Sequence, residues 1–166
     1  MIEDMATLVT SAVTGVFSTM LSYSINSSPS ASLPNAGSGN GATSHVAGGV
    51  GFGGDVTGVV YIVVAAGFAR EITCRLLGIG DAEIESESMV NDAIGELANM
   101  VVGQIKSQLC DRGMPCVLTI PSIVRGSSFS LEGCSTDEHN AYRFLCANQQ
   151  LSVEVLVKPS TNGNTH

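Results

Sequence analysis

The feature that most constrains the fold is a long run of apolar residues at helical spacing. Six of them step by three or four positions and share one side of an α-helix: Val90, Ile94, Leu97, Val101, Ile105 and Leu109. Ser86 is a suitable N-cap, and Glu87 suits the first turn. Gly113 can adopt the left-handed conformation that ends a helix, and Pro115 prevents the helix from resuming. These signals predict one long helix that ends near Asp111.

Polar and small residues occupy the opposite side of this helix. Glu96 and Asn99 are three positions apart, so at about 100° per residue they share a face, and Asp92 and Gly103 fall on the same strip. Asparagine is a modest helix former, and the long Glu/Lys ladder of an ordinary solvated helix is absent here. A solvated polar face is the plain alternative. The pattern favours a carboxylate and a carboxamide presented to a partner, with Gly103 leaving room for its approach.

Composition restricts the kind of partner. The chain has 166 residues, of which 44% are hydrophobic, enough for one domain with a substantial core. A net charge of −8 argues against binding to a nucleic-acid backbone, which requires a basic stripe. The absence of tryptophan also disfavours stacking on bases. An acidic surface suits a basic protein partner, although it also simply promotes solubility.

The metal-binding and nucleophilic residue types form no recognisable set. There are five cysteines with irregular spacing and no CxxC, which indicates neither a disulfide framework nor a zinc site. Three of them are expected to pack as small hydrophobic residues. These are Cys74, Cys116 and Cys146. The histidines are His45, His139 and His166, expected at a loop edge, in a polar turn and in the tail. We therefore expect no metal and no cofactor in this chain itself.

The N-terminal residues and the hydropathy pattern bear on location. The sequence begins MIEDMATLV, which is acidic and unlike a secretory signal. The most hydrophobic run, residues 56–69, is shorter than a membrane span and contains glycine. We expect a cytoplasmic protein with no membrane partner.

The chain before the long helix alternates between helical and extended patterns. Residues 2–23 predict an amphipathic helix, and residues 26–44 a flexible Ser/Gly-rich loop. Residues 46–65 predict a two-stranded hairpin that turns at 53–55. Its glycines lack the GxxxxGK[ST] ending and do not precede a helix, so they do not predict a phosphate-binding loop. Residues 67–79 predict a short helix.

The chain after the long helix predicts three strands and a disordered tail at 159–166. The strands are expected at 116–124, 141–147 and 151–157. The predicted fold is therefore α/β (α+β), with a largely antiparallel sheet and two long helices packed on one face. We expect a single domain spanning residues 1–158.

The strip and its surroundings resemble a known family. The segment DAIGELANMVVGQIKSQL resembles the signature helix of the CheC/CheX/FliY chemotaxis phosphatases, which carries an acidic or Ser position, then ExxN, then a small residue. The segments GGDVTGVVYIVV and FAREITCRLLG are similar to the family's strand pair and first helix. The resemblance covers roughly residues 1–25 and 45–157. Glu3 is followed three residues later by Ala6, so the N-terminal helix holds no second copy, and the chain resembles CheX-type members with one copy per subunit.

This resemblance implies an activity and a set of partners. It implies hydrolysis of the aspartyl-phosphate of a CheY-like response-regulator receiver domain, with Glu96 and Asn99 as catalytic residues inserted into the receiver. Asp92 and Gly103 would contact the partner, and Mg²⁺ would belong to the receiver. It also implies a homodimer joined through edge strands, for which residues 151–157 are the candidate.

Two other functions stay open at this stage. Rotor proteins such as FliM share the fold, so the chain could be a non-catalytic receiver-binding or scaffold module. A small-molecule sensor that uses the hairpin glycines is the third alternative.

Overall fold

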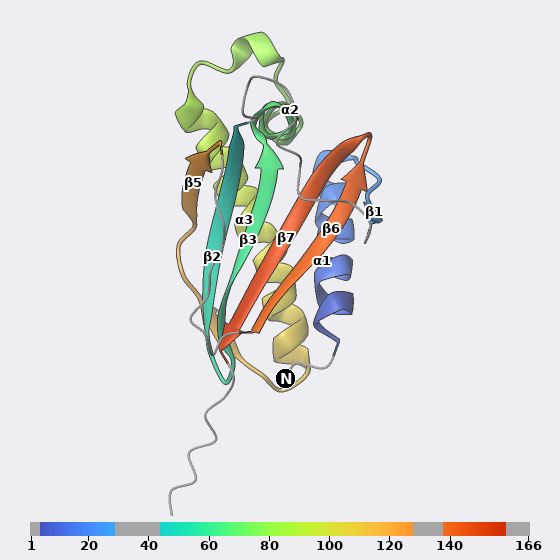
Figure 1. Ribbon diagram of the computed structural model, residues 1–166, viewed down its shortest axis with the longest axis vertical. Coiled ribbons are helices and arrows are strands. Elements are labelled where there is room, and N and C mark those ends of the chain that lie inside the picture. Colours follow the sequence, from blue (N-terminus) through green and yellow to red (C-terminus); the bar gives the residue numbers. More distant parts are fainter. Residues whose placement is uncertain (1–3, 29–43, 128–137, 159–166) are drawn as a thin grey trace, which may run out of the picture.

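The computed structural model describes residues 4–28, 44–127 and 138–158, which form a seven-stranded antiparallel sheet with helices packed on one face (Figure 1). The helices are α1 (Met5–Leu21), α2 (Ala66–Leu77) and α3 (Glu87–Asp111), with a 3₁₀ turn η1 (Asp81–Glu83). The strands are β1 (Asn26–Ser27), β2 (His45–Gly54), β3 (Thr57–Ala65), β4 (Cys116–Leu118), β5 (Ser122–Gly126), β6 (Glu138–Cys146) and β7 (Gln149–Lys158). The sheet order is β1-β6-β7-β3-β2-β4, with β5 also beside β2. The predicted fold class is confirmed.

The core lies between the sheet and the helices. In Figure 1, α1 and α3 lie behind the sheet, and α2 lies at one end of it. Alternate residues of the central strands point at the helices, as the two-residue period of a strand requires. On β2, β3 and β7 these buried residues are Val46, Val50, Val60, Ile62, Val64, Leu151, Val153 and Val155. Because α1, α2 and α3 all contribute to this one apolar cluster, the described residues share a single core.

Helix α3 ends as the sequence predicted. Gly113 has φ +77°. Its N–H donates to the Cys110 carbonyl (2.9 Å), and the Met114 N–H donates to the Leu109 carbonyl (2.9 Å). This pair of bonds is a Schellman motif, which satisfies carbonyls that the last turn leaves unpaired. Ser86 occupies the N-cap position in an extended conformation, although its side chain makes no capping bond.

Gly48 of β2 faces α3 at a place with little room for a side chain. A Cβ at Gly48 would lie 3.1 Å from both Cγ2 and the carbonyl oxygen of Ile94, and 3.2 Å from Cβ of Ala98. These distances are shorter than normal van der Waals contact. The missing side chain therefore sets the height of α3 above the sheet.

Gly48→Ala is expected to lower the free energy of unfolding by about 1–3 kcal/mol, because the new methyl group must push α3 away from β2. Urea or thermal denaturation measures the change. Gly15→Ala on α1 is the control, since a Cβ there meets nothing within 4 Å. The control should stabilise by about 0.5–1 kcal/mol through helix propensity. A Gly48→Ala variant as stable as the wild type would contradict the close packing.

The strand predicted at 116–124 is two strands. Both β4 and β5 pair with β2, but Ile120 and Pro121 interrupt the ladder. Proline has no N–H to donate, so it is confined to strand ends, edges and bulges. The sequence interpretation of one continuous strand is wrong at this point.

The assignment of residues 151–157 to an edge is also wrong. These residues lie in β7, which pairs with β6 on one side and with β3 on the other. A strand with both neighbours in its own chain cannot pair with a second copy. The sheet ends instead at β1 and β6 on one side, and at β4 and β5 on the other. The homodimer itself stays a prediction.

Two loop predictions need correction, and others fall outside the described residues. Asn26 and Ser27 form β1, which pairs with Leu145 and Phe144 of β6, so the predicted loop starts later than residue 26. His139 lies within β6 and not in a polar turn. The remainder of that loop at 29–43 and the tail at 159–166 lie outside the described residues.

A buried carboxylate lies on the sheet face away from the helices. Glu154 is 4% exposed. Its carboxylate accepts bonds from Arg143 (2.6 Å) and Ser152 (2.5 Å) and lies 2.7 Å from Nε2 of His139, while Arg143 also donates to the Ser152 hydroxyl. Burial raises the pKa of Glu154, but the bonds from Ser152, His139 and Arg143 outweigh it, so the net pKa lies below the ordinary 4.5.

A carboxyl group with a lowered folded-state pKa stabilises the fold above its unfolded pKa, and this stabilisation is lost as the pH falls through the folded pKa. Glu154→Gln is therefore expected to cost about 2–3 kcal/mol at about pH 7, partly because Arg143 keeps a poorly paired charge. The difference from the wild type should shrink below about pH 4.5, where the Glu154 carboxyl of the unfolded chain begins to protonate while the folded one is still ionised. Urea denaturation at several pH values checks this, and a pH-independent difference would contradict it.

Candidate functional site on helix α3

The four residues of the predicted strip lie together on the outer side of α3. Asp92, Glu96 and Asn99 are exposed, and Gly103 is half-buried beside them. The six apolar residues that predicted the helix are each at most 2% exposed and pack into the core. Because that side of α3 is fixed against the sheet, the directions of the Cα–Cβ bonds of Glu96 and Asn99 are fixed as well.

Residues of the sheet edge lie against α3 on one side of the strip. Gly95 is buried. A Cβ built on Gly95 would lie 3.5 Å from Cβ of Pro121. Near the start of α3, Nε of Arg125 donates to Oδ1 of Asn91 (2.5 Å), and its guanidinium also reaches the Glu87 carbonyl (3.5 Å). Residues of β5 and of the segment before it therefore clamp the N-terminal half of α3.

Helix α1 holds the other flank and runs antiparallel to α3. Nε2 of Gln108 donates to the Leu8 carbonyl (3.4 Å), and Arg112 lies 3.8 Å from Asp4. The early residues of α1 thus meet the late residues of α3. Clamped on both flanks, α3 is a rigid support for the strip.

The polar groups of the strip are unpaired within the described part of the chain. No ion pair there involves Asp92 or Glu96, and no side-chain hydrogen bond involves Asn99. A carboxylate accepts bonds from a cation, whereas a carboxamide both donates and accepts and can orient water without transferring a proton. The strip can therefore position a partner's groups, but it holds no nucleophile of its own.

Other reactive residue types do not form a second site in the described residues. No group of three or more His, Cys, Asp or Glu side chains there could hold a metal ion. Cys116 and Cys146 are buried as predicted, and burial raises the pKa of both thiols, which makes them less reactive. Cys74 is only partly buried. Cys134 and His166 lie outside the described residues.

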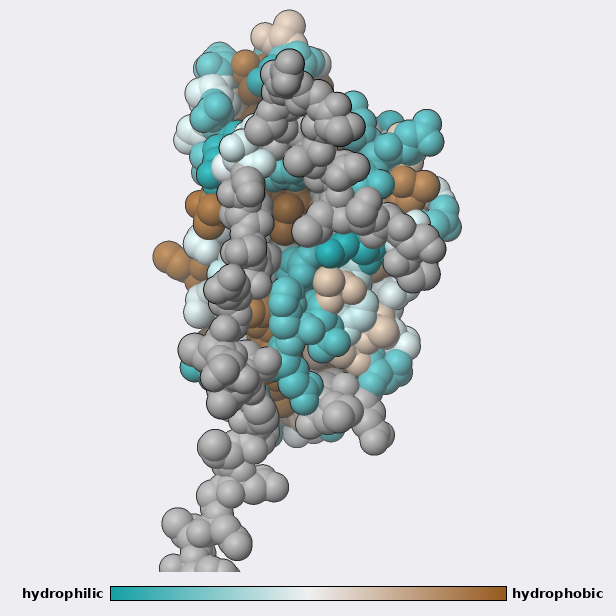
Figure 2. Space-filling view, in the orientation of Figure 1, coloured by the Kyte–Doolittle hydropathy of each residue, from teal (hydrophilic) through white to brown (hydrophobic). Residues whose placement is uncertain are grey.

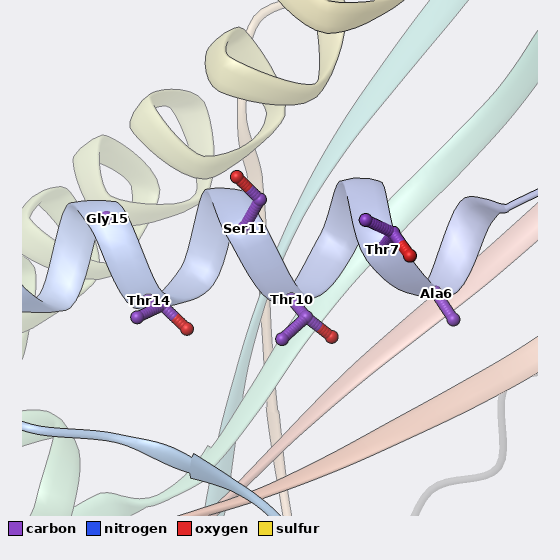
Figure 3. A pocket seen from close by; sticks show the side chains of 6 residues that line it. All are labelled: Ala6, Thr7, Thr10, Ser11, Thr14 and Gly15. Atoms are coloured by element: carbon purple, nitrogen blue, oxygen red, sulfur yellow. The ribbon is translucent and has the colours of Figure 1, made fainter.

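A shallow depression on the outer side of α1 carries no comparable chemistry. It is lined by Ala6, Thr7, Thr10, Ser11, Thr14 and Gly15 (Figure 3). All six come from one helix, and none is ionisable. The described residues of α1 hold no carboxylate–amide pair, as the sequence predicted. The single pair on α3 is therefore the candidate site, and it lies on a convex helix surface.

Sequence reasoning missed the residues that support the strip. Nothing in the helical pattern linked Arg125 or Pro121 to α3, because both belong to a separate segment. The available signal was Pro121 itself, since proline within a β-prone run marks an edge or a bulge. The Glu154 cluster was also missed, although Glu154 alternates with the apolar residues Val153 and Val155.

Among the described helices, none has the length and apolar composition needed to cross a bilayer.

Solved structures with this architecture define the class of fold. A chemotaxis protein CheX from Desulfovibrio desulfuricans is 22% identical, with a TM-score of 0.75 over 92% of this chain and 98% of that one. A CheC-like superfamily protein from a Shewanella species is 25% identical, with a TM-score of 0.75 over 96% and 100%. A chain of the CheX–CheY–BeF₃–Mg²⁺ complex from Borrelia burgdorferi is 20% identical, with a TM-score of 0.70 over 94% and 99%. The chain therefore has the CheC/CheX-like fold.

Sequence comparison assigns the family within that class. The family model described as "Chemotaxis phosphatase CheX" matches residues 46–145, which include β2, β3, α2 and α3 with the whole strip. The chain belongs to the CheX family. A search of curated proteins found no match.

Proposed function

We propose that this chain accelerates hydrolysis of the aspartyl-phosphate of a CheY-like receiver domain by placing Asn99 and Glu96 in the receiver's active site. The carrying observation is that both side chains are exposed and unpaired on a helix whose other side is fully buried. Membership of a chemotaxis phosphatase family supports the reaction class. The relative solved in complex with CheY, BeF₃ and Mg²⁺ supports the kind of partner.

The reaction requires little chemistry from this chain. A water oxygen attacks phosphorus, the bond between phosphorus and the aspartyl oxygen breaks, and the products are the free aspartate and inorganic phosphate. The aspartyl oxygen leaves readily, and the receiver supplies Mg²⁺ and a lysine to neutralise the phosphoryl charge. What the receiver lacks is a water held in line with the breaking bond. Restricting that water is a positioning effect that can contribute several orders of magnitude.

The two side chains divide this task. The Asn99 amide orients the attacking water by hydrogen bonding, and it is too weakly basic to take a proton. The Glu96 carboxylate pairs with the receiver's lysine, which fixes the receiver so that Asn99 meets the phosphoryl group. Asp92 adds negative charge on the same strip, and Gly103 lets the partner's backbone approach α3. No metal or cofactor in this chain takes part.

At a saturating concentration of this protein, Asn99→Ala is expected to slow hydrolysis of the phosphorylated receiver by about a hundredfold or more. Binding should be preserved, because only the positioning of water is lost. Glu96→Ala should weaken binding as well, by about tenfold, since it removes the charge contact. Stopped-flow decay of the phosphorylated receiver, together with titration of the beryllofluoride-loaded receiver, measures both effects. Gln104→Ala, an exposed carboxamide elsewhere on α3, is the matched control and should change neither.

Two results would overturn this mechanism. Full acceleration by Asn99→Ala would show that the amide does not position the water. Binding of the receiver by the wild type without any change in the phosphoryl lifetime would favour the scaffold alternative.

Gly103 offers a separate test of close approach. A Cβ at Gly103 meets nothing within 4 Å among the described residues, so a side chain can leave the helix there without a clash at its first atom. Gly103→Gln should raise the free energy of unfolding by about 0.5–1 kcal/mol and still weaken receiver binding by about tenfold. Gly15→Gln on α1, equally open, should stabilise similarly and leave binding unchanged. Thermal melting and receiver titration separate the two effects, and unimpaired binding by Gly103→Gln would refute close approach.

A further inference from the structure

The sheet edge beside α3 exposes several large apolar side chains. Ile120 is 88% exposed, Val117 is 74% exposed and Val124 is 45% exposed. Figure 2 shows apolar surface along the left edge of the molecule, where Figure 1 places β5. Of the three, Ile120 is both the most exposed and the nearest in sequence to Pro121, which contacts α3.

A bulge in the edge strand sets the direction of Ile120. The Thr119 N–H donates to the Gly51 carbonyl (2.9 Å), and Ser122 pairs with Gly49. Two residues, Ile120 and Pro121, therefore stand opposite the single β2 residue between those pairs. Such a bulge re-aims side chains at the edge of a sheet. Pro121 turns onto α3, and Ile120 turns into solvent.

The bulge borders the strip. Pro121 lies against Gly95, and at about 100° per residue Asn99 lies about 40° around α3 from Gly95 while Asp92 lies about 60° around. The strip thus begins next to the place where Pro121 meets the helix. Ile120 directly precedes Pro121 in the chain and belongs to the sheet edge that flanks the strip.

Ile120 is held in a defined position. Thr119 is fixed to β2 by two hydrogen bonds, since Oγ1 of Thr119 also accepts the Gly51 N–H (2.9 Å). Pro121 on the other side is fixed against α3. An isoleucine anchored on both sides and almost fully exposed is a preformed apolar contact, and it loses little freedom when covered.

The bulge also decides between occupants. A second copy that extended the sheet here would need a regular row of N–H and C=O groups, which a bulge with a proline interrupts. A partner docked on the strip needs no strand pairing at this edge, and Pro121, the residue after Ile120, lies beside α3 where the strip begins. We propose that Ile120 is an apolar contact for the receiver domain that docks on Asp92, Glu96 and Asn99. This inference rests on the proposed function and adds to it a residue that contributes affinity and does not position water.

The test compares Ile120→Ser with Val124→Ser, a control at another exposed apolar residue of the same sheet edge, in β5. Titration of each full-length variant with beryllofluoride-loaded CheY-like receiver measures binding, and decay of the phosphorylated receiver at saturation measures rate. Burying one isoleucine side chain corresponds to roughly tenfold to hundredfold in affinity. Ile120→Ser should weaken binding by that factor with the saturated rate unchanged, and Val124→Ser should bind within about twofold of the wild type.

The outcomes separate this inference from the proposed function. A wild type that binds the receiver without accelerating hydrolysis refutes the phosphatase function, and the two serine variants still decide the role of Ile120. Equal binding by Ile120→Ser and the wild type overturns the inference alone. The inference is also overturned if Ile120→Ser, measured without receiver, has a different sedimentation coefficient from the wild type. In that case a second copy of the chain would be what covers Ile120. No receiver binding by the wild type overturns both proposals.

Discussion

The structure depends on the packing of α3 against β2 across Gly48. A Cβ at that position would lie only 3.1–3.2 Å from atoms of Ile94 and Ala98, so the glycine lets this part of α3 settle onto the sheet, and the apolar side of the helix joins the core. A helix seated so closely cannot rotate about its axis without breaking many contacts at once. The outward direction of Glu96 and Asn99 is therefore a consequence of packing on the opposite side of the same helix.

A convex site has a different logic from a pocket. A pocket can bring a nucleophile and an acid together in one chain and exclude water from them. Helix α3 instead presents an amide and carboxylates on a ridge. Such a ridge can only complete a cleft that already holds the reacting bond and its counter-charges. In the proposed reaction the Mg²⁺ would belong to the receiver and not to this chain. The proposed chemistry is distributed between two proteins, and this chain contributes the geometry of one water molecule.

The sequence predicted the elements that follow a local repeat of apolar residues, and it missed the contacts that depend on pairing between distant segments. Helix α3, its Gly113 terminus and the strip followed from local spacing, because 3.6-residue periodicity and capping are written in neighbouring residues. The hairpin of β2 and β3 followed likewise. The place of residues 151–157 in the sheet did not, because alternation identifies a strand without identifying its neighbours. Arg125 and Pro121 were missed for the same reason, since their contacts with α3 join segments about 25–35 positions apart.

The exposed residues of the strip and the residues that position it differ in how freely they can be substituted. Glu96, Asn99 and Asp92 are exposed, and they are unpaired among the described residues, so substitutions there are expected to cost little stability; under the proposed function they change recognition. Gly48 and Gly95 act in the opposite way, because they determine where the strip lies and are themselves buried. Ile120 falls between these groups: Thr119 before it is bonded to β2 and Pro121 after it lies beside α3, while its own side chain is exposed. Under the proposed docking, an edge residue of this kind can be exchanged to suit a different receiver while α3 keeps its geometry, which separates the choice of partner from the positioning of water.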